Sequence, residues 1–319
     1  AVPLHTPLFR GERRLRIALV GMPNAGKSTL FNAVSSTSPH KGELTGTHRV
    51  YSACTVQIGF DQASGMELPS IRSLRRLAQD DLVALKCLLL GDEPPPVSAH
   101  EPAGPPAPLA PPGVIVQVVD ATRLESHLEL TLELIELGRP MVIALNMMDD
   151  AAKKGLYVNV GELSARLGVP VVPTVALMGQ GISQLFAAAV DAARANAIPL
   201  PQPANRHIRE SLQPLSDVLD RPEIRAAFRV PHPFLLMQVT SGDRYFLDEL
   251  RQHFPALLPE LERLRSEAGR GMPRPLEEEL HADLHHRAAT LFEAGTRMGA
   301  PHEGRGWRYW LDELFLHPQ

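Results

Sequence analysis

One segment determines how the rest of the chain is interpreted: Leu15-RIALVGMPNAGKS-Thr29. The apolar run Leu15–Val20 is bounded by Gly21, which predicts a buried strand. The residues from Gly21 onward fit the pattern G-x-x-x-x-G-K-[ST], and Ser28–Val34 then predicts a helix. In this pattern glycines let backbone N–H groups face phosphates, and the start of the helix adds positive potential. The segment therefore predicts a phosphate-binding loop, the P-loop, between a strand and a helix.

The P-loop combines two side chains of clear chemical role with backbone groups that line the phosphates. Lys27 is expected to bridge the β- and γ-phosphates, and Ser28 is expected to hold Mg²⁺. The alternative is a chance glycine-rich turn, and the strand before the motif and the helix after it argue against that alternative. The remaining contacts to the nucleotide are assigned to Gly21, Pro23, Asn24, Ala25, Gly26 and Thr29.

A second motif, Asn146-Met147-Met148-Asp149, follows the apolar run Met141–Leu145. In GTPases an Asn/Thr-x-x-Asp sequence at a strand end reads guanine, because the Asp accepts hydrogen bonds from N1–H and the exocyclic amine. A site built to bond such groups typically rejects analogues that lack them by about 10⁴-fold or more. A helix cap would use the same residue types. Downstream of a P-loop, base reading by Asn146, Met147 and Asp149 is favoured, and the two motifs indicate GTP rather than ATP.

Strand-like and helix-like runs alternate up to about residue 197. This pattern predicts an α/β protein with the P-loop GTPase fold, in which a mostly parallel six-stranded sheet carries helices on both faces. A smaller all-helical domain is expected next, because no convincing strand run lies between Arg206 and Ala300. A capping box at Thr122–Glu125 is expected to start one helix. Further expected strands are Val50–Phe60, Val114–Val119, Met141–Leu145 and Val169–Val175, and expected helices include Ile71–Leu90, Val160–Leu167 and Ile182–Ala195.

The predicted organisation is an N-terminal tail (1–12), a GTPase domain (13–197), a proline-rich linker (198–205) and a helical domain (206–319). Nine of the thirty prolines lie between Pro94 and Pro112. So many prolines remove too many N–H donors for a helix or a strand, which predicts an inserted surface loop over 91–113. A passive insertion is favoured over a polyproline segment that binds a partner.

The composition limits the classes of function. The 319 residues carry a net charge of −4 and contain two cysteines. This charge gives no electrostatic footprint for nucleic acid, which argues against a GTPase associated with the ribosome or with tRNA. Two cysteines exclude a disulfide framework and favour a reducing cytosol. No apolar run approaches the roughly 18 residues of a membrane helix, and the N-terminus does not read as a secretory signal.

Four stretches resemble FeoB, the prokaryotic ferrous-iron transporter: Gly21-MPNAGKSTLFNA-Val34, Val118-VDATRLESHLELTLELIEL-Gly138, Val142-IALNMM-Asp149 and Leu163-SARLGVPVV-Pro173. The resemblance implies a GTPase domain, a helical domain and then a polytopic membrane domain that would begin where this chain stops. It implies GTP and GDP as ligands and slow GTP hydrolysis that regulates Fe²⁺ transport. It places the chain at the cytoplasmic face of the inner membrane and leaves open whether the chain forms a homo-oligomer.

The resemblance also assigns roles to individual residues. Asn24 matches a P-loop Asn that is linked to a K⁺ ion beside the phosphates, so Asn24 joins Lys27 as a catalytic candidate. The alternative is that Asn24 only caps the loop backbone. The base-supporting loop lacks its usual Ser, so backbone N–H groups of Val175, Ala176 and Leu177 are expected to serve there. The other residues that match are Gly21, Gly26, Ser28, Asn146 and Asp149.

The two switch segments depart from the family pattern. In the first switch, Gly42–His48, Thr47 is the candidate for Mg²⁺ binding and catalysis, with Thr45 second. The second switch is Glu67-Leu-Pro-Ser70, and Glu67 stands where an Asp would hold a Mg²⁺-bound water. Ser70 replaces a Gly whose N–H meets the γ-phosphate, and its Cβ would penalise a positive φ.

These departures bear on hydrolysis. No catalytic base and no arginine finger is identified, and Arg72 fits a solvated surface residue better than an internal finger. Slow turnover is therefore expected, and the alternative is a guanine-nucleotide switch with little or no hydrolysis. His281 and His285 lie at helical i, i+4 spacing, where a solvated helix face is favoured over a metal site.

Overall fold

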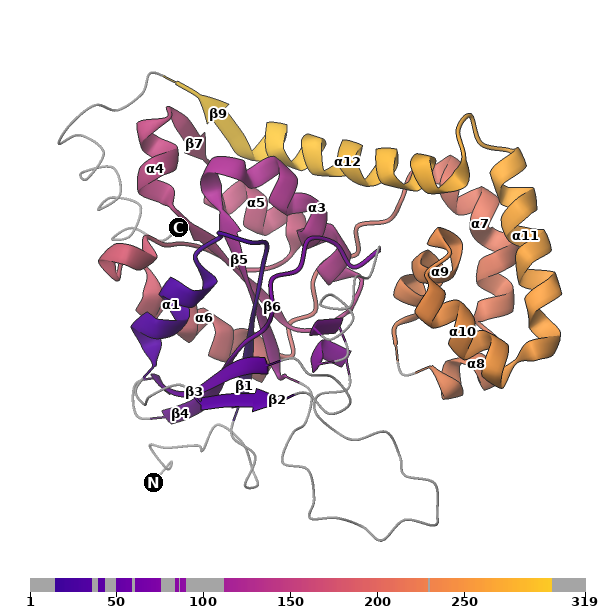
Figure 1. Cartoon of the computed structure of the whole chain (residues 1–319). Coiled ribbons are helices and arrows are strands. Elements are labelled where there is room, and N and C mark those ends of the chain that lie inside the picture. Colours follow the sequence, from indigo (N-terminus) through magenta and orange to yellow (C-terminus); the bar gives the residue numbers. More distant parts are fainter. Residues whose placement is uncertain are drawn as a thin grey trace, which may run out of the picture.

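A seven-stranded sheet in the order β2-β3-β4-β1-β5-β6-β8 lies at the centre of the structure (Figure 1). The computed structural model describes residues 15–35, 40–43, 50–58, 61–75, 84–85, 87–89, 112–228 and 230–299. Strands β4, β1, β5, β6 and β8 run parallel, whereas β2 and β3 pair antiparallel at one edge. The strands are β1 (Leu15–Val20), β2 (His40–Glu43), β3 (Val50–Ile58), β4 (Asp61–Glu67), β5 (Val114–Asp120), β6 (Met141–Asn146) and β8 (Val171–Pro173).

The α/β class and the mostly parallel sheet are confirmed, and within the described residues the sheet includes the short edge strand β2 beside six other strands. The sequence pattern gave no sign of β2 or of β4. The four residues of β2, His-Lys-Gly-Glu, lack the apolar side chains that mark a buried strand. In β4 the sequence Asp-Gln-Ala-Ser-Gly-Met-Glu is mostly polar, and its strand form depends on pairing with β1 and β3.

Side chains along β1 alternate between two apolar cores on the two faces of the sheet. Ile17 and Leu19 join one core with side chains of α1 and α6. Ala18 and Val20 join the other with side chains of α3, α4 and α5. The predicted layering, with helices on both faces, is therefore confirmed. The helices of the two layers are α1 (Lys27–Val34), α6 (Ile182–Ala195), α3 (Leu124–Ile135), α4 (Met148–Lys153) and α5 (Val160–Leu167).

The entry into α3 differs from the expected capping box at Thr122. A short 3₁₀ turn, η1 (Ala121–Arg123), joins β5 to the helix. The Thr122 N–H donates to Asp120 Oδ1 at 2.8 Å, and no side chain caps α3 itself. The expectation of a Thr122–Glu125 capping box is therefore wrong, because Asp120 at the strand end already supplies the acceptor.

The region after residue 205 is mainly helical, and it ends in a strand that the sequence did not reveal. Strand β9 (Thr296–Met298) pairs antiparallel with β7 (Leu156–Val158) of the sheet domain. Three residues are too few for a periodic signal, so the expectation of no strand between 206 and 300 is wrong there. The helices are α7 (Arg206–Leu219), α8 (Pro222–Ala227), α9 (His232–Ser241), α10 (Arg244–His253), α11 (Leu258–Arg270) and α12 (Leu276–Gly295), with a short 3₁₀ turn at η3 (Pro255–Leu257). Another 3₁₀ turn, η2 (Ala176–Met178), follows β8 in the sheet domain.

Helix α12 joins the helical region to the sheet domain (Figure 1). It runs back across α3 and meets α5, where the Asn159 N–H donates to the Gly295 carbonyl at 2.8 Å. One buried apolar core includes residues from α3, α5 and α12 and from the helical region. The predicted boundary at 198–205 has no helix or strand, but the two parts share a core across it.

Several expectations concern segments with a partial description. The expected helix Ile71–Leu90 is wrong at its start, because residues 71–75 are not helical, whereas 84–85 and 87–89 are. The N-terminal tail (1–12), residues 91–111 of the proline-rich insertion and residues 300–319 lie outside the described residues. Within the described ranges, no helix combines the length and the apolar character needed to cross a bilayer.

Candidate nucleotide-binding site

The carboxyl ends of four parallel strands bring the predicted site residues to one edge of the sheet. Leu19 in β1 is in register with Glu67, the last residue of β4. Asp120 at the end of β5 is in register with Asn146 at the end of β6. In open parallel sheets ligands bind at this edge. The P-loop, the second switch and the base-reading motif therefore meet where the chain order predicted.

The backbone of the P-loop has the shape that its sequence requires. Gly26 has φ 93° and Asn24 has φ 66°, both in the left-handed region. A Cβ atom on Gly26 would collide with the Asn146 side-chain nitrogen, so the glycine also permits close contact with β6. Asn24 is exposed at the loop tip, and its tolerance of a positive φ is typical of asparagine.

Lys27 is the buried cation of the site, with 6% of its surface exposed. Its Nζ donates to the Ser70 hydroxyl at 2.6 Å and to the Gly21 carbonyl at 3.3 Å. Burial lowers the pKa of Lys27, and the nearby Glu67 carboxylate opposes that shift. Because both hydrogen-bond acceptors are neutral, the ammonium group is suited to bind an anion such as a phosphate.

Ser28 and Glu67 lie together beside Lys27. The Ser28 hydroxyl donates to Glu67 Oε1 at 2.5 Å. Ser28 is exposed and Glu67 is half-buried, so both oxygens lie at the open edge of the site. A hydroxyl and a carboxylate are oxygen ligands of the kind that Mg²⁺ prefers. The donor set therefore fits the divalent cation that accompanies a nucleotide.

The second switch begins at the end of β4, and the backbone there is hydrogen-bonded to β1 and to the P-loop. The Leu68 N–H donates to the Leu19 carbonyl and the Ile71 N–H donates to the Gly21 carbonyl, each at 3.1 Å. The expected strain at Ser70 is absent, since its φ is not positive in the described chain. Arg72 is exposed and lines a cavity with α3 and α12 side chains, as expected for a surface residue rather than an arginine finger.

The Asn146 side chain makes contacts within the protein besides the contact with the base that its motif predicts. Its Nδ2 donates to the Ala25 carbonyl at 3.0 Å, and its Oδ1 accepts from the Ala176 N–H at 3.0 Å and the Thr174 hydroxyl at 3.3 Å. The side chain is 3% exposed. Asn146 therefore links the P-loop to the loop after β8, and its amide nitrogen keeps a second N–H for the expected contact with the base.

Asp149 is the second polar residue of the base-reading motif. It lies in the first turn of α4, after Met147 with φ 60°. Its Oδ2 lies 3.3 Å from Lys153 Nζ. In the facing loop, Val175 pairs with Gln180, and the Ala176 N–H already donates to Asn146, so that N–H does not serve a base directly. Leu177 is 90% exposed at the tip of the loop.

Comparison with known proteins identifies the family to which this chain belongs. The model of the family "Ferrous iron transport protein B" matches residues 15–97 and 109–189. The chain belongs to this family. Its nucleotide-binding half is accordingly a GTPase-family domain, and the P-loop GTPase fold predicted from the sequence is confirmed.

Relatives and solved structures agree with this assignment. The Fe(2+) transporter FeoB of Escherichia coli K12 is 32% identical over 80% of this chain and 30% of its own length. An NFeoB mutant of S. thermophilus bound to GDP superimposes with a TM-score of 0.73 at 26% identity, over 89% of this chain and 100% of that one. The cytosolic domain of L. pneumophila FeoB shares the fold, with a TM-score of 0.69 at 23% identity over 88% and 99% of the two chains.

This FeoB-family chain spans about 30% of the length of the E. coli transporter that it matches.

Thr45 and Thr47, the first-switch candidates, lie outside the described residues. His285 Nδ1 lies 2.8 Å from Glu129 Oε1, and that hydrogen bond raises the pKa of His285. The described residues hold no cluster of three or more His, Cys, Asp or Glu side chains placed to bind a metal.

Sequence reasoning missed the side-chain roles of Thr174 and Ser70 in this FeoB-family site. Thr174 supports Asn146, and Ser70 contacts Lys27 through its hydroxyl. From the sequence, only the backbone N–H and the Cβ of Ser70 are given a consequence. Its identity, in place of the family's Gly, was the available signal, since a hydroxyl beside a buried ammonium group is a natural acceptor.

Proposed function

We propose that this chain binds guanine nucleotides and slowly hydrolyses GTP as the regulatory part of a ferrous-iron transporter. The observation that carries the proposal is the Asn146 side chain, which joins the P-loop at Ala25 to the loop at Ala176. That bridge holds Asp149 and the P-loop at fixed positions along one sheet edge. The relatives support the assignment, since the E. coli protein is an Fe(2+) transporter and the S. thermophilus NFeoB is bound to GDP.

The proposed roles follow from the charges and oxygens at this edge. Lys27 binds the β- and γ-phosphates, and its ammonium group opposes the charge that develops on the phosphates during transfer. Ser28, Glu67 and Thr47 are the proposed Mg²⁺ ligands, with Glu67 acting through a water. When bound, Mg²⁺ neutralises phosphate charge.

Hydrolysis is proposed to be slow, with Asn24 as the K⁺-binding residue. Asn24 is exposed at the loop tip beside the phosphate-binding backbone, which leaves its side chain free to meet an ion there. A monovalent cation at that place would supply positive charge that an arginine finger supplies in other GTPases. Gly21, Pro23, Ala25, Gly26 and Thr29 complete the proposed phosphate contacts. Asn146, Met147, Asp149 and the loop of Val175, Ala176 and Leu177 line the proposed base site.

The context of the whole transporter is part of the same proposal. Residues 13–197 form the proposed GTPase domain and residues 206–319 the helical domain, joined by the linker 198–205. The proposed partner is a polytopic membrane domain of the same transporter, with this part at the cytoplasmic face of the inner membrane. The E. coli relative, of which this chain spans 30%, supports that arrangement.

Phosphate release under multiple turnover tests the proposed activity. We expect the wild-type chain with GTP and Mg²⁺ to release phosphate slowly, faster in K⁺ than in Na⁺, and Lys27→Ala to abolish release. Asn24→Ala should remove the difference between K⁺ and Na⁺. Release no greater than that of Lys27→Ala, with GTP binding intact, would favour a nucleotide switch without hydrolysis.

A further inference from the structure

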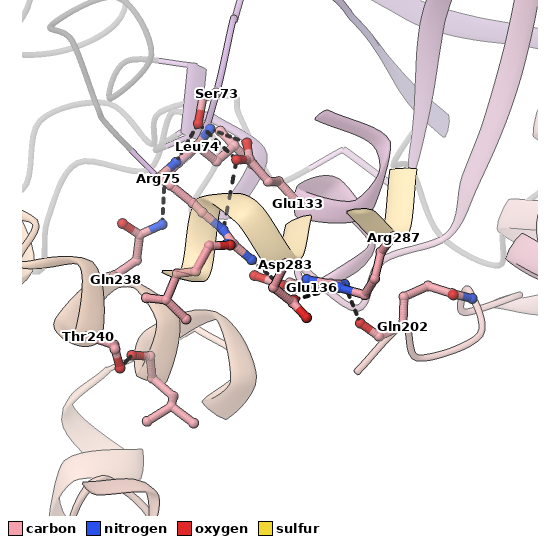
Figure 2. Close-up of polar contacts among 12 residues, drawn as sticks. Ser73, Leu74, Arg75, Glu133, Glu136, Gln202, Gln238, Thr240, Asp283 and Arg287 are labelled. Atoms are coloured by element: carbon pink, nitrogen blue, oxygen red, sulfur yellow. Dashed lines mark hydrogen bonds and ion pairs between the residues drawn. The ribbon is translucent and has the colours of Figure 1, made fainter. Parts of the chain in front are cut away.

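The residues that follow the second switch connect the P-loop to three helices. On the P-loop side, the Ser70 hydroxyl accepts from Lys27 and the Ile71 N–H donates to Gly21. Ser73, Leu74 and Arg75 come next and have no helical or strand structure. Side chains of α3 and α9 reach this short segment (Figure 2). Its position is therefore set by side-chain contacts rather than by a backbone ladder.

One carboxylate on α3 accepts hydrogen bonds from two consecutive residues and lies near the guanidinium group of a third. Glu133 is 2% exposed. Its Oε1 accepts from the Ser73 hydroxyl at 2.8 Å, and its Oε2 accepts from the Leu74 N–H at 2.5 Å. Arg75 Nε lies 3.9 Å from Oε1. A charged acceptor strengthens each of these bonds, so the ionised form of Glu133 holds the segment more tightly than the neutral form.

The helical region holds the same segment from the other side. Gln238 of α9 donates to the Leu74 carbonyl at 2.6 Å. Arg75 donates to the Leu280 carbonyl of α12 at 3.1 Å and to Glu136 of α3 at 3.2 Å. Both backbone groups of Leu74 are thus bonded to buried side chains. A displacement that begins at Ser70 cannot be absorbed at Leu74 without breaking one of these bonds.

The surroundings place the ionisation of Glu133 near neutral pH. Burial raises its pKa to about 7, while Arg75, the Leu74 N–H and the Ser73 hydroxyl oppose that rise. The carboxylate of Glu136, just after the end of α3, raises the pKa of Glu133 further. The other charged or titratable groups that line the adjacent cavity are Arg72, Glu129, Glu277 and His281, and Asp283 and Arg287 of α12 face Glu136.

We propose that Glu133 is a positioning residue for the second switch, and that GTP binding, as distinct from GDP binding, is coupled to proton uptake by its carboxylate. The inference rests on the proposed function, because it requires a γ-phosphate at Lys27. That phosphate competes with the Ser70 hydroxyl for the ammonium group, so the segment after Ser70 shifts. Weaker bonds from Leu74 and Ser73 destabilise the carboxylate, and a proton from the buffer neutralises it.

Calorimetry of nucleotide binding near pH 7, in buffers of different ionisation enthalpy, measures this coupling. With the whole chain, Mg²⁺ and a slowly hydrolysed GTP analogue, we expect a fraction of one proton to be taken up per nucleotide. With GDP we expect almost none. Glu133→Gln keeps an acceptor oxygen and similar volume but cannot titrate, so its uptake with the analogue should fall to the GDP value.

Two further variants distinguish proton uptake by Glu133 from proton uptake by neighbouring groups. Glu129→Gln, on the same helix and paired with His285, should leave the uptake unchanged. Ser73→Ala removes one donor to the carboxylate without altering α3, so the pH of greatest uptake should rise. This shift keeps the inference testable even if Glu133→Gln folds poorly.

Two results would overturn the inference while the proposed function stands. One is that the wild type binds the GTP analogue with the same proton uptake as GDP. The other is that Glu133→Gln retains the wild-type uptake. Failure to bind either guanine nucleotide would instead refute the proposed function, and with it the inference.

Discussion

Asn146 shows how a single amide group can fix two loops of a binding site. Its nitrogen serves the Ala25 carbonyl and its oxygen serves the Ala176 N–H, and the side chain is almost fully buried. Ala25 and Ala176 are both buried, so water cannot replace the amide as their hydrogen-bond partner. Asn146 therefore contributes to nucleotide binding by positioning the P-loop and the base-side loop.

Removing this amide should cost both stability and affinity. Asn146→Ala leaves a buried carbonyl and a buried N–H without a partner, at about 1–3 kcal/mol for each. We expect thermal unfolding to show a loss of about 3 kcal/mol and guanine-nucleotide affinity to fall at least tenfold. The control is Asn159→Ala, which removes the N-cap of α5 at Glu162. It should cost about 1 kcal/mol and leave affinity unchanged. Wild-type affinity in Asn146→Ala would contradict this role.

The Ser70 hydroxyl is expected to compete with the γ-phosphate for Lys27. It lies 2.6 Å from the ammonium nitrogen. A hydrogen bond to a charged group contributes about 1.5–3 kcal/mol, and Ser70→Ala removes that contribution only from the nucleotide-free state. We therefore expect Ser70→Ala to bind GTP about tenfold more tightly, measured by titration with a fluorescent GTP analogue. Ser28→Ala should weaken binding in Mg²⁺. Unchanged or weaker GTP binding by Ser70→Ala would refute the competition.

His127 should make the fold sensitive to acid. It is 1% exposed, and burial lowers its pKa to about 4, so the folded protein holds it neutral. Because the unfolded chain binds a proton more readily, stability is lost as the pH falls from about 6.5 towards 4, by up to about 3 kcal/mol. His127→Asn should flatten the loss in urea unfolding across this range. An equally steep loss in the variant would assign the acid sensitivity to other groups.

At the scale of residues, the sequence predicts what a short motif contains. Gly21, Lys27, Ser28 and Asp149 are predicted as site residues because fixed spacing links each to a known chemistry. Glu133 was not found, because its partners lie about sixty positions earlier in the chain and its helix pattern resembles an ordinary surface position. Contacts between distant segments leave no local signal.

At the scale of elements, the strands that contain apolar runs (β1, β3, β5, β6 and β8) were predicted, whereas the polar strands β2 and β4 and the short pair β7 and β9 were not. Strands β5 and β6 are buried at every position, which is typical of strands in the middle of a parallel sheet. Strands β7 and β9 have three residues each and exist through their pairing with one another. Their formation depends on where α12 ends, which no local pattern reveals.

The end of α12 should tolerate no added side chain. A Cβ atom on Gly295 would lie 2.5 Å from Leu163 Cδ2 of α5. Overpacking of this kind typically costs about 1–3 kcal/mol, so Gly295→Ala should lower the unfolding midpoint in urea. The matched control is Gly269→Ala in α11, where the nearest contact is 3.7 Å and a better helix former should stabilise by up to about 1 kcal/mol. Equal stability of the two variants would contradict the close docking of α12 on α5.

At the scale of the whole molecule, the helical region is joined to the GTPase-family domain by a shared core rather than by a linker alone. Apolar side chains of α7, α9, α11 and α12 belong to the same cluster as those of α3 and α5. The sequence predicted an α/β region followed by a mainly helical region, as observed. Periodicity cannot reveal that α12 returns to the sheet domain. The contact of Arg75 with the Leu280 carbonyl of α12 follows from that return.

Selectivity for guanine is the property on which the proposed function depends most. It is measured by the affinities of the wild-type chain for GTP and ATP in Mg²⁺, with Lys27→Ala and Asp149→Ala alongside. We expect GTP to bind at least about 10⁴-fold more tightly than ATP. Asp149→Ala should lose most of that preference, and Lys27→Ala should weaken both nucleotides. Equal affinity of the wild type for ATP and GTP would contradict the assignment of this site to guanine nucleotides.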